Sequence, residues 1–456
     1  MWPCLAELDT MSNHLINQHY LDSLMNAALE ATPSASVCSL HIAAEDTTFI
    51  RFNHARVRQA TQVSQAYATV TLTQNARSAD STLTLVGDRL LDTAALLHAQ
   101  AELARDLPFL PEDPYLLKPD TVADTTRDDA GSLPSASAVI DAVASHAQGL
   151  DLVGFYASGP IVRAYADSRG QRNWHRVDTF SFDWCLYHST DKAVKALRAG
   201  RTWDEGAWAA QLAQGAAQLH LLGQAPRTLA PGRYRAYFAP SAMAELLGVL
   251  AWSGFGQKEQ AVGTSSLTRL VRGDAALHPS VQLSEDTGHS MAPAFTPDGF
   301  TGPGQVPLVV NGRHAGTLCS PRSAREFGLS TNGALAGESP QALSLAAGTL
   351  PEAGALQALG TGLYISNLHY LNYSDRQHCR VTGMTRFACF WVENGELVAP
   401  LQVMRFDDDL LDLLGPRLVA LTDRAELHPE TSTYGQRQLS SITTPGALVE
   451  GFELTL

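Results

Sequence analysis

The sequence lacks two features that would assign a function class at once. No uncharged apolar stretch approaches the ~18 residues that a membrane span needs. Its 32 Lys and Arg residues form no cluster, and a net charge of −14 would repel a phosphate backbone. We therefore expect no membrane span and no nucleic-acid binding.

Cysteine is scarce and scattered. The six cysteines form no Cys-x-x-Cys pair, so neither a zinc ribbon nor a thioredoxin-like redox site is indicated; they are Cys4, Cys38, Cys185, Cys319, Cys379 and Cys389. We expect them to be small buried residues. The N-terminal residues 1–20 are polar and lack the basic-then-apolar order of a signal peptide. These features predict a cytoplasmic protein.

The length of 456 residues is about three times the ~150-residue expectation for one domain, so two or three domains are expected. A link rich in Pro and Gly at residues 227–233 suggests a boundary. We predict an α+β fold. Residues 1–230 would form an N-terminal domain with an antiparallel sheet and helices, and residues 231–456 a β-rich C-terminal domain.

Local patterns predict the elements of these domains. Apolar–polar alternation predicts strands over 37–43, 47–52, 56–59, 67–73, 173–177 and 180–188, and a hairpin of 151–157 with 161–167 around Ser158-Gly159-Pro160. Helical spacing predicts helices over 83–104, 241–251 and 407–414. A further helix would begin at a capping box of Thr202 with Glu205 and end at Gly223.

The most distinctive phrase in the second half is TGMTRFACFWVENGEL, residues 382–397. It resembles T-G-D-F-S-x-G-A-x-G-F-W-I-E-N-G-E-I, a phrase of the TldD/PmbA family, whose members were once called modulators of DNA gyrase. Residues 399–414 resemble that family's next segment, and residues 49–59 resemble its x-V-R-F-x-N-x-x-V-x-Q hairpin. Weaker likenesses at 263–267, 311–312 and 438–446 occur in the same order. The resemblance therefore spans residues 49–456.

Within the main phrase, four positions are candidates for a peptide-binding or a purely structural motif: Thr382, Gly383, Asn394 and Gly395. An Asn-Gly pair between apolar runs is in any case a hairpin signal. Residues 295–299, FTPDG, depart from the D-D-E-G often seen in the family, so this is a divergent copy.

The resemblance implies a zinc site in TldD-type subunits, built from an H-E-x-x-x-H helix and a cysteine near the C-terminus. The matching helix lies in residues 238–253, with Gly248 and Val249 at the His-Glu positions and Ser253 at the second His. No histidine occurs in residues 221–277 and no cysteine after residue 389, so Thr433 falls near the expected cysteine. The degenerate motif therefore implies a TldE (PmbA)-like subunit with no catalytic residue, metal or other cofactor in this chain.

By the same resemblance, the chain would pair with a TldD-like subunit that carries the zinc, or form a homodimer. The substrate would be an unfolded peptide or peptide precursor, held by addition to an exposed strand edge. Two alternatives stay open: hydrolysis by this chain through another site, and a stand-alone peptide-binding or peptide-processing role in a biosynthetic pathway.

Two other clusters are weaker candidates. His369, His378 and Cys379 could suggest a metal site, but adjacent residues of a strand point to opposite faces. Asp183 and Cys185 would share a strand face that His188 does not, and nothing suggests the third group that orients a catalytic base. We favour ordinary structural roles for both clusters.

Overall fold

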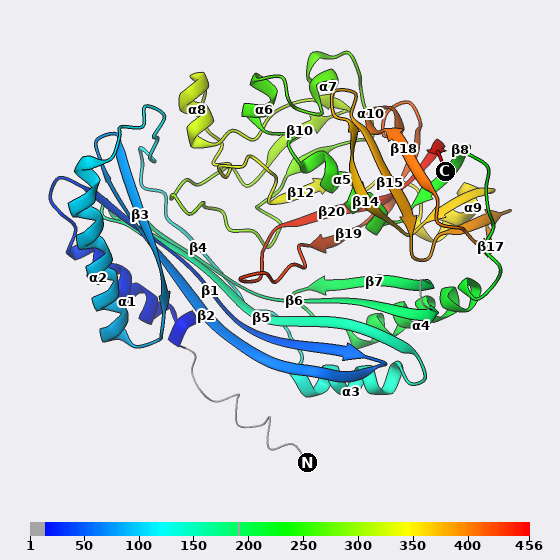
Figure 1. Cartoon of the computed structure of the whole chain (residues 1–456), viewed down its shortest axis with the longest axis horizontal. Helices are drawn as coiled ribbons and strands as arrows, with labels where there is room; N and C mark the ends of the chain where they lie inside the picture. The colour runs from blue at the N-terminus through cyan, green and yellow to red at the C-terminus, as the bar shows by residue number, and fades with distance from the viewer. Residues whose placement is uncertain (1–13, 190–191) are drawn as a thin grey trace.

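The computed structural model describes residues 14–189 and 192–456. Its N-terminal half contains α1 (Gln18–Glu30), β1 (Val37–Asn53), β2 (Arg56–Gln74), β3 (Arg77–Leu85), α2 (Arg89–Asp106), β4 (Thr125–Asp129), α3 (Ala136–His146), β5 (Asp151–Asp167), β6 (Arg172–Ser189), β7 (Lys192–Gly200) and α4 (Glu205–Leu222). These strands form one long, curved sheet, shown in blue to green in Figure 1.

The C-terminal half forms a second sheet with short helices around it. Its elements are β8 (Gly232–Phe238), α5 (Pro240–Ala251), α6 (Gln257–Ala261), α7 (Thr268–Arg272), β9 (Leu283–Glu285), β10 (Val306–Val310), β11 (Arg313–His314), α8 (Pro321–Phe327), β12 (Ala342–Leu345), α9 (Ala355–Leu359), β13 (Gly362–Ile365), β14 (Asn367–Asp375), β15 (Arg380–Arg386), β16 (Phe390–Glu393), β17 (Glu396–Pro400), β18 (Arg405–Asp409), α10 (Leu410–Leu413), β19 (Leu418–Pro429) and β20 (Ser441–Leu454).

The pairing pattern confirms the predicted α+β class. The first sheet has the order β3-β2-β1-β5-β6-β4, with β7 also beside β6, and only the β4–β6 pair is parallel. The second sheet has 13 strands and mixes antiparallel pairs with the parallel pairs β12–β20 and β8–β13. The division into domains 1–230 and 231–456 itself stays a prediction; the chain passes from α4 to β8 through residues 223–231.

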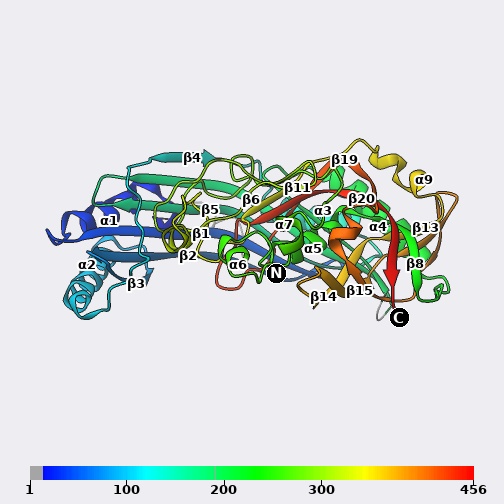
Figure 2. The ribbon, with the colours of Figure 1, turned by 90° about the horizontal axis from the view of Figure 1, so that it is seen from above.

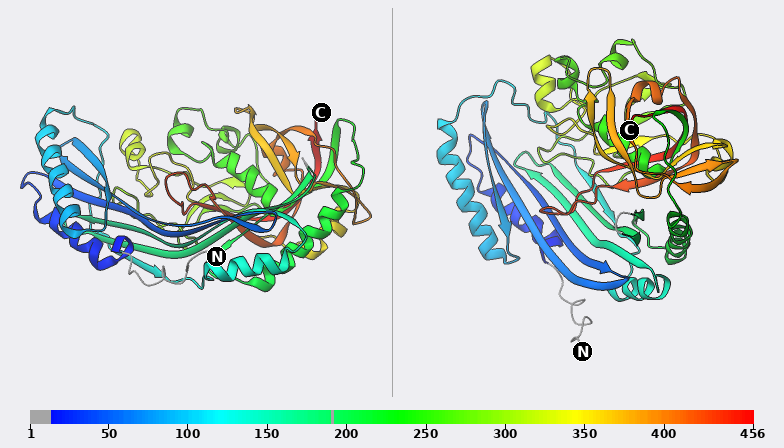
Figure 3. Two further views of the ribbon diagram at one scale, coloured as in Figure 1. Left: turned by 60° about the horizontal axis from the view of Figure 1, so that its bottom comes forward. Right: turned by 45° about the vertical axis from the view of Figure 1, so that its right-hand side comes forward.

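The two faces of the first sheet have different neighbours. Because successive side chains of a strand point to opposite faces, every second residue of β6 meets the same layer. Phe180, Phe182 and Trp184 pack against α3 and α4, and α1 and α2 cover the same face at the other end of the sheet. Val177 packs on the opposite face against Met291 and Leu439 of the C-terminal half. The sheet is thus a middle layer between helices and the C-terminal half (Figures 1 and 3).

The molecule is elongated along this sheet, as the view from above shows (Figure 2). The α1–α2 pair lies at one end, and β8, β13 and α9 lie at the other. No helix of the described residues is long and apolar enough to cross a membrane. Residues 1–13 lie outside the described residues. They include Cys4 and most of the N-terminal stretch in which the sequence predicted no signal peptide.

Four predicted strand boundaries were wrong. Residues 37–53 form one strand without a turn, and residues 56–74 and 172–189 do the same. The predicted hairpin around Ser158-Gly159-Pro160 is also a single strand, β5, which pairs with β1 on both sides of this segment. Gly159 is needed there because a Cβ atom would overlap the backbone carbonyl of Asp46. The Gly therefore marks a close approach of two strands and not a turn.

Three helix starts also differ from prediction. The helix predicted over 83–104 begins only at Arg89, as α2, because residues 83–85 end strand β3 and Asp88 caps the helix. Helix α4 is capped by Asp204, whose side chain accepts a hydrogen bond from Ala207 N at 2.9 Å, and not by Thr202. Asp407 to Asp409 end strand β18, and only Asp409 caps the short helix α10. The predicted helix 241–251 is confirmed as α5.

Candidate functional site

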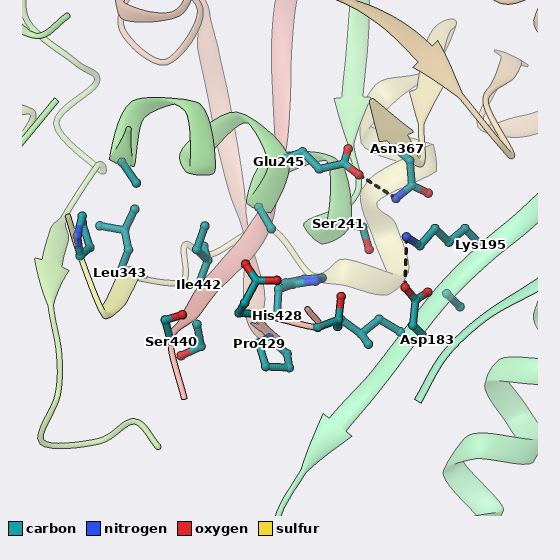
Figure 4. A pocket seen from close by; sticks show the side chains of 18 residues that line it. Asp183, Lys195, Ser241, Glu245, Leu343, Asn367, His428, Pro429, Ser440 and Ile442 are labelled. Carbon is teal, nitrogen blue, oxygen red and sulfur yellow. Dashed lines mark hydrogen bonds and ion pairs between the residues drawn. The ribbon is translucent and has the colours of Figure 1, made fainter. Parts of the chain in front are cut away.

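A cleft of ≈400 Å³ lies between the two halves of the molecule. Its walls are β6 and β7 of the first sheet, helix α5, strands β12, β14, β19 and β20, and the segment of residues 430–440 that joins β19 to β20. Figure 4 shows the side chains that line it. The structure thus brings together α5 and the 430–440 segment, the two regions where the family resemblance implies metal ligands.

Helix α5 presents a core side and a cleft side. It begins after Ala239 with Pro240 in its first turn, where a missing N–H is tolerated. Met243, Leu246 and Leu250 are buried in the core of the C-terminal half. At helical spacing from these residues, the cleft is lined by Ser241, Ala244, Glu245 and Ala251.

The sequence-predicted positions on this helix do not share one side. A Cβ atom on Gly248 would lie 3.7 Å from Ile442 Cδ1, a residue of the cleft lining. Val249 instead packs in the core, and Ser253 follows the end of the helix with φ = +67°. Thr433 lies in the 430–440 segment, of which Glu430, Thr431 and Ser440 line the cleft. Among Gly248, Val249, Ser253 and Thr433, it is Gly248 that lies against a residue of the cleft lining.

Sequence reasoning missed Glu245, the charged residue that α5 contributes to the cleft. Its carboxylate accepts hydrogen bonds from Leu368 N and from Asn367 Nδ2, the latter at 3.3 Å. Burial raises the pKa of Glu245 to about 7, against the opposing effect of these two hydrogen bonds. A signal was present: the window 244–249 has the His-Glu-x-x-x-His spacing, with Ala244 and Val249 at the His positions and the Glu retained.

Two neighbouring strands of the first sheet contribute an ion pair. Lys195 Nζ on β7 lies 3.3 Å from Asp183 Oδ2 on β6, and both side chains are about one-third exposed. Burial alone would lower the pKa of Lys195, but attraction to Asp183 outweighs it and raises the pKa. Lys195 is therefore an ammonium ion at neutral pH, and Figure 4 shows it reaching toward Ser241 and Asn367.

Strand β19 contributes the one imidazole of the cleft lining, His428. Burial lowers its pKa to about 4, so the ring is neutral at pH 7. Zinc sites take at least three protein ligands from His, Cys, Asp and Glu side chains. In this cleft Glu245 is already hydrogen-bonded and Asp183 is paired with Lys195. Across residues 14–189 and 192–456, no group of three such side chains could hold a metal ion, and the donors present do not fit a zinc site.

The 430–440 segment is fastened to the first sheet by buried charges. The Arg437 guanidinium donates to Thr179 O, to Thr179 Oγ1 at 2.6 Å and to Gly159 O at 3.2 Å. Glu45 on β1 accepts a hydrogen bond from Arg437 N at 3.1 Å, and Arg163 donates to Arg437 O. This network fixes one wall of the cleft against the N-terminal half.

The other candidate residues lie outside the cleft lining. Thr382 Oγ1 donates to Phe406 O, and a Cβ atom on Gly383 would contact the Phe406 ring. Asn394 and Gly395 form the turn between β16 and β17 with φ of +52° and +82°. These contacts are those of a structural motif.

Neither of the two weaker clusters forms a group of three side chains that could hold a metal ion, within the described residues. His378 pairs with Asp375, and Cys379 is buried. Asp183 faces the cleft with Lys195, and His188 lies beside Gly223 at the end of α4.

Comparison with known proteins agrees with the fold. Residues 231–456 match the PmbA/TldA metallopeptidase C-terminal domain. The chain belongs to the PmbA/TldD family. No curated protein matches it by sequence.

Solved structures with the same fold cover nearly the whole chain. TldE from Thermococcus kodakarensis is 12% identical with a TM-score of 0.78, covering 96% of this chain and 100% of that one. A protein from Thermotoga maritima, described as a putative modulator of a DNA gyrase, is 14% identical with a TM-score of 0.73, covering 96% and 99%. A similarly described protein from Bacteroides thetaiotaomicron is 14% identical with a TM-score of 0.71, with the same coverage.

Proposed function

We propose that this chain is a TldE-like, non-catalytic subunit of a zinc peptidase complex and that its cleft holds an extended peptide. The observation that carries the proposal is the cleft side of α5. It presents Ser241, Ala244 and Glu245, with Gly248 beside Ile442, where a zinc subunit of the family is expected to present histidines. A TldD-like partner would supply the zinc and the cleavage.

Strand β7 supports the binding of peptide. It is an edge strand that pairs only with β6 among the described strands, and residues 195–197 line the cleft. An edge strand offers main-chain N–H and C=O groups to an added strand, which gives affinity without a demand for particular side chains. Because Leu197 O already accepts from Gln211 Nε2 at 3.3 Å, we expect the peptide to add toward the Lys195 end.

The test compares three samples: the purified chain, a TldD-like subunit of the same organism, and both together. Each is assayed for bound zinc, for binding of fluorescein-labelled fragments of unfolded casein, and for their cleavage. We expect the chain alone to bind fragments without cutting them, and EDTA-sensitive cleavage only with the partner present. Stoichiometric zinc together with EDTA-sensitive cleavage by the chain alone would overturn the proposal.

The β7 edge is tested with modified peptides. N-methylation of alternate main-chain nitrogens removes hydrogen-bond donors from one edge of an extended peptide. We expect one of the two alternate methylation patterns to abolish fragment binding and the other to have a smaller effect. Equal effects of both patterns would exclude strand addition.

A further inference from the structure

Asn367 holds an acceptor atom that has no hydrogen-bond partner among the residues that the structure describes. The residue begins β14, and its side chain lies at the cleft while the next residue, Leu368, points into the core. Only 4% of Asn367 is exposed. Its Nδ2 donates to Glu245 Oε1, but Oδ1 is buried and makes no hydrogen bond within the described residues.

A buried carbonyl oxygen without a donor is unfavourable, and such atoms are rare in folded proteins. When Glu245 is ionised, the contact fixes the orientation of the amide, since Nδ2 must then face the carboxylate oxygen that accepts from it. Oδ1 is therefore held as an acceptor on the side of the amide away from Glu245, in a residue that lines the cleft beside Glu245 and Lys195 (Figure 4). A ligand with an N–H group would satisfy it.

The charges around the site decide between the possible donors. Lys195 already pairs with Asp183, and both oxygens of Glu245 accept hydrogen bonds from the protein, so no free carboxylate beside Asn367 remains to balance a second cation. A guanidinium group would need a pair of free carboxylate oxygens, but Glu245 accepts from both Asn367 and Leu368. A neutral N–H remains, and Lys195 and the Ser241 hydroxyl are donors for a carbonyl oxygen on the same ligand.

A main-chain amide combines these two groups. Resting on the proposed function, we propose that Asn367 Oδ1 accepts a hydrogen bond from one main-chain N–H of the peptide in the cleft. Asn367 is then a positioning residue for the peptide. It fixes the register of the peptide relative to α5, whereas the edge of β7 binds the peptide along its length.

The test is an ester scan of one peptide. The casein fragment that binds most tightly is remade with each main-chain N–H replaced in turn by oxygen, and dissociation constants are measured with the wild-type chain and with Asn367→Leu. We expect one ester to weaken wild-type binding about five-fold to ten-fold and to have no such effect on Asn367→Leu. Asn372→Leu, on the same strand with an exposed side chain, is the matched control and should keep the wild-type ester profile.

A second variant covers the case in which Asn367→Leu does not fold. Asn367→Asp is measured at pH 6, where Glu245 keeps its proton and can donate to the new carboxylate. It keeps the size and an acceptor, so it should retain the sensitivity to the same ester. If fragments bind but every ester affects wild type and Asn367→Leu alike, the role of Asn367 is wrong while the proposed function stands. If no fragment binds the wild type at all, the proposed function itself fails.

Discussion

On one face of β6, Phe182 and Trp184 lie under α4, whereas on the other face Thr179 and Asp183 meet the C-terminal half. The first face is closed by aromatic packing. The second combines the hydrogen bond from Arg437 to Thr179 with the apolar contact of Val177 with Met291 and Leu439, and it leaves the cleft open. A single strand thus joins the stabilising core to the site, and changes on its two faces should have separable effects on stability and on binding.

The largest effect is expected on the aromatic face. Phe182 is fully buried, with its ring centroid 5.8 Å from Trp208 and 5.6 Å from Phe52. We expect Phe182→Ala to lower the free energy of unfolding by about 3–5 kcal/mol, since it removes buried area and leaves a cavity. Urea unfolding measures the change, and the 87%-exposed Phe109 gives the control variant Phe109→Ala. A loss below about 1 kcal/mol would show that the site can collapse around the missing ring.

The next effect concerns the polar face. Arg437→Leu leaves the carbonyls of Thr179 and Gly159 without their donor and removes a cation near Glu45. We expect a loss of about 2–4 kcal/mol in unfolding free energy. We also expect faster amide exchange across residues 430–440, because this side chain fastens the segment. Arg424→Leu, at an exposed position of β19, should change neither measurement. Unchanged exchange in Arg437→Leu would mean that main-chain bonds alone hold the cleft wall.

A smaller effect with the opposite sign is expected at Glu245. Burial raises the pKa of its carboxyl from the ordinary 4.5 to about 7 in the folded chain. As pH rises through this window, the unfolded chain releases the proton while the folded chain keeps it, so stability falls and then stays low above pH 7. Glu245→Gln cannot ionise and should exceed wild type by about 1–3 kcal/mol at pH 8, with no gain at pH 4.

The control for this pH dependence is Glu430→Gln, which changes an exposed carboxylate of the same cleft. Its unfolding free energy should follow that of wild type at both pH values. A gain for Glu245→Gln that is equal at pH 4 and pH 8 would show that it arises from packing and not from ionisation.

The fold could be predicted where the signal is local. The apolar stripe of α5 and the alternation in β1 and β2 arise from side chains close together in sequence, and these elements were placed correctly in outline. The predicted hairpin at Gly159 was wrong because Gly159 is required by the close approach of the Asp46 carbonyl, on a strand far away in the sequence. Helix α1 was missed although Tyr20, Leu21, Leu24 and Ala28 carry a helical apolar pattern.

The site was predictable only in part, for the same reason. The motif comparison identified α5 and the region of Thr433, and these segments do wall one cleft. Lys195, Asp183 and Asn367 join it from β7, β6 and β14, and no sequence spacing connects them. Glu245 was within reach, because the core stripe of Met243, Leu246 and Leu250 determines which positions of α5 remain for the cleft.

The smallest effect tests the boundary of α4, the helix that closes the aromatic face. Asp204 caps it through Ala207 N, whereas Thr202, the residue favoured by the sequence pattern, is exposed and lies two residues earlier. We expect Asp204→Ala to reduce the unfolding free energy by about 1 kcal/mol, and Thr202→Ala to stay within about 0.5 kcal/mol of wild type. Asp204→Asn keeps an accepting oxygen and should restore most of the loss. A larger loss of unfolding free energy for Thr202→Ala than for Asp204→Ala would show that Thr202 caps α4 after all. Because α4 packs on the face of β6 away from the cleft, none of these variants should alter peptide affinity, and a change in affinity would show that the two faces are coupled.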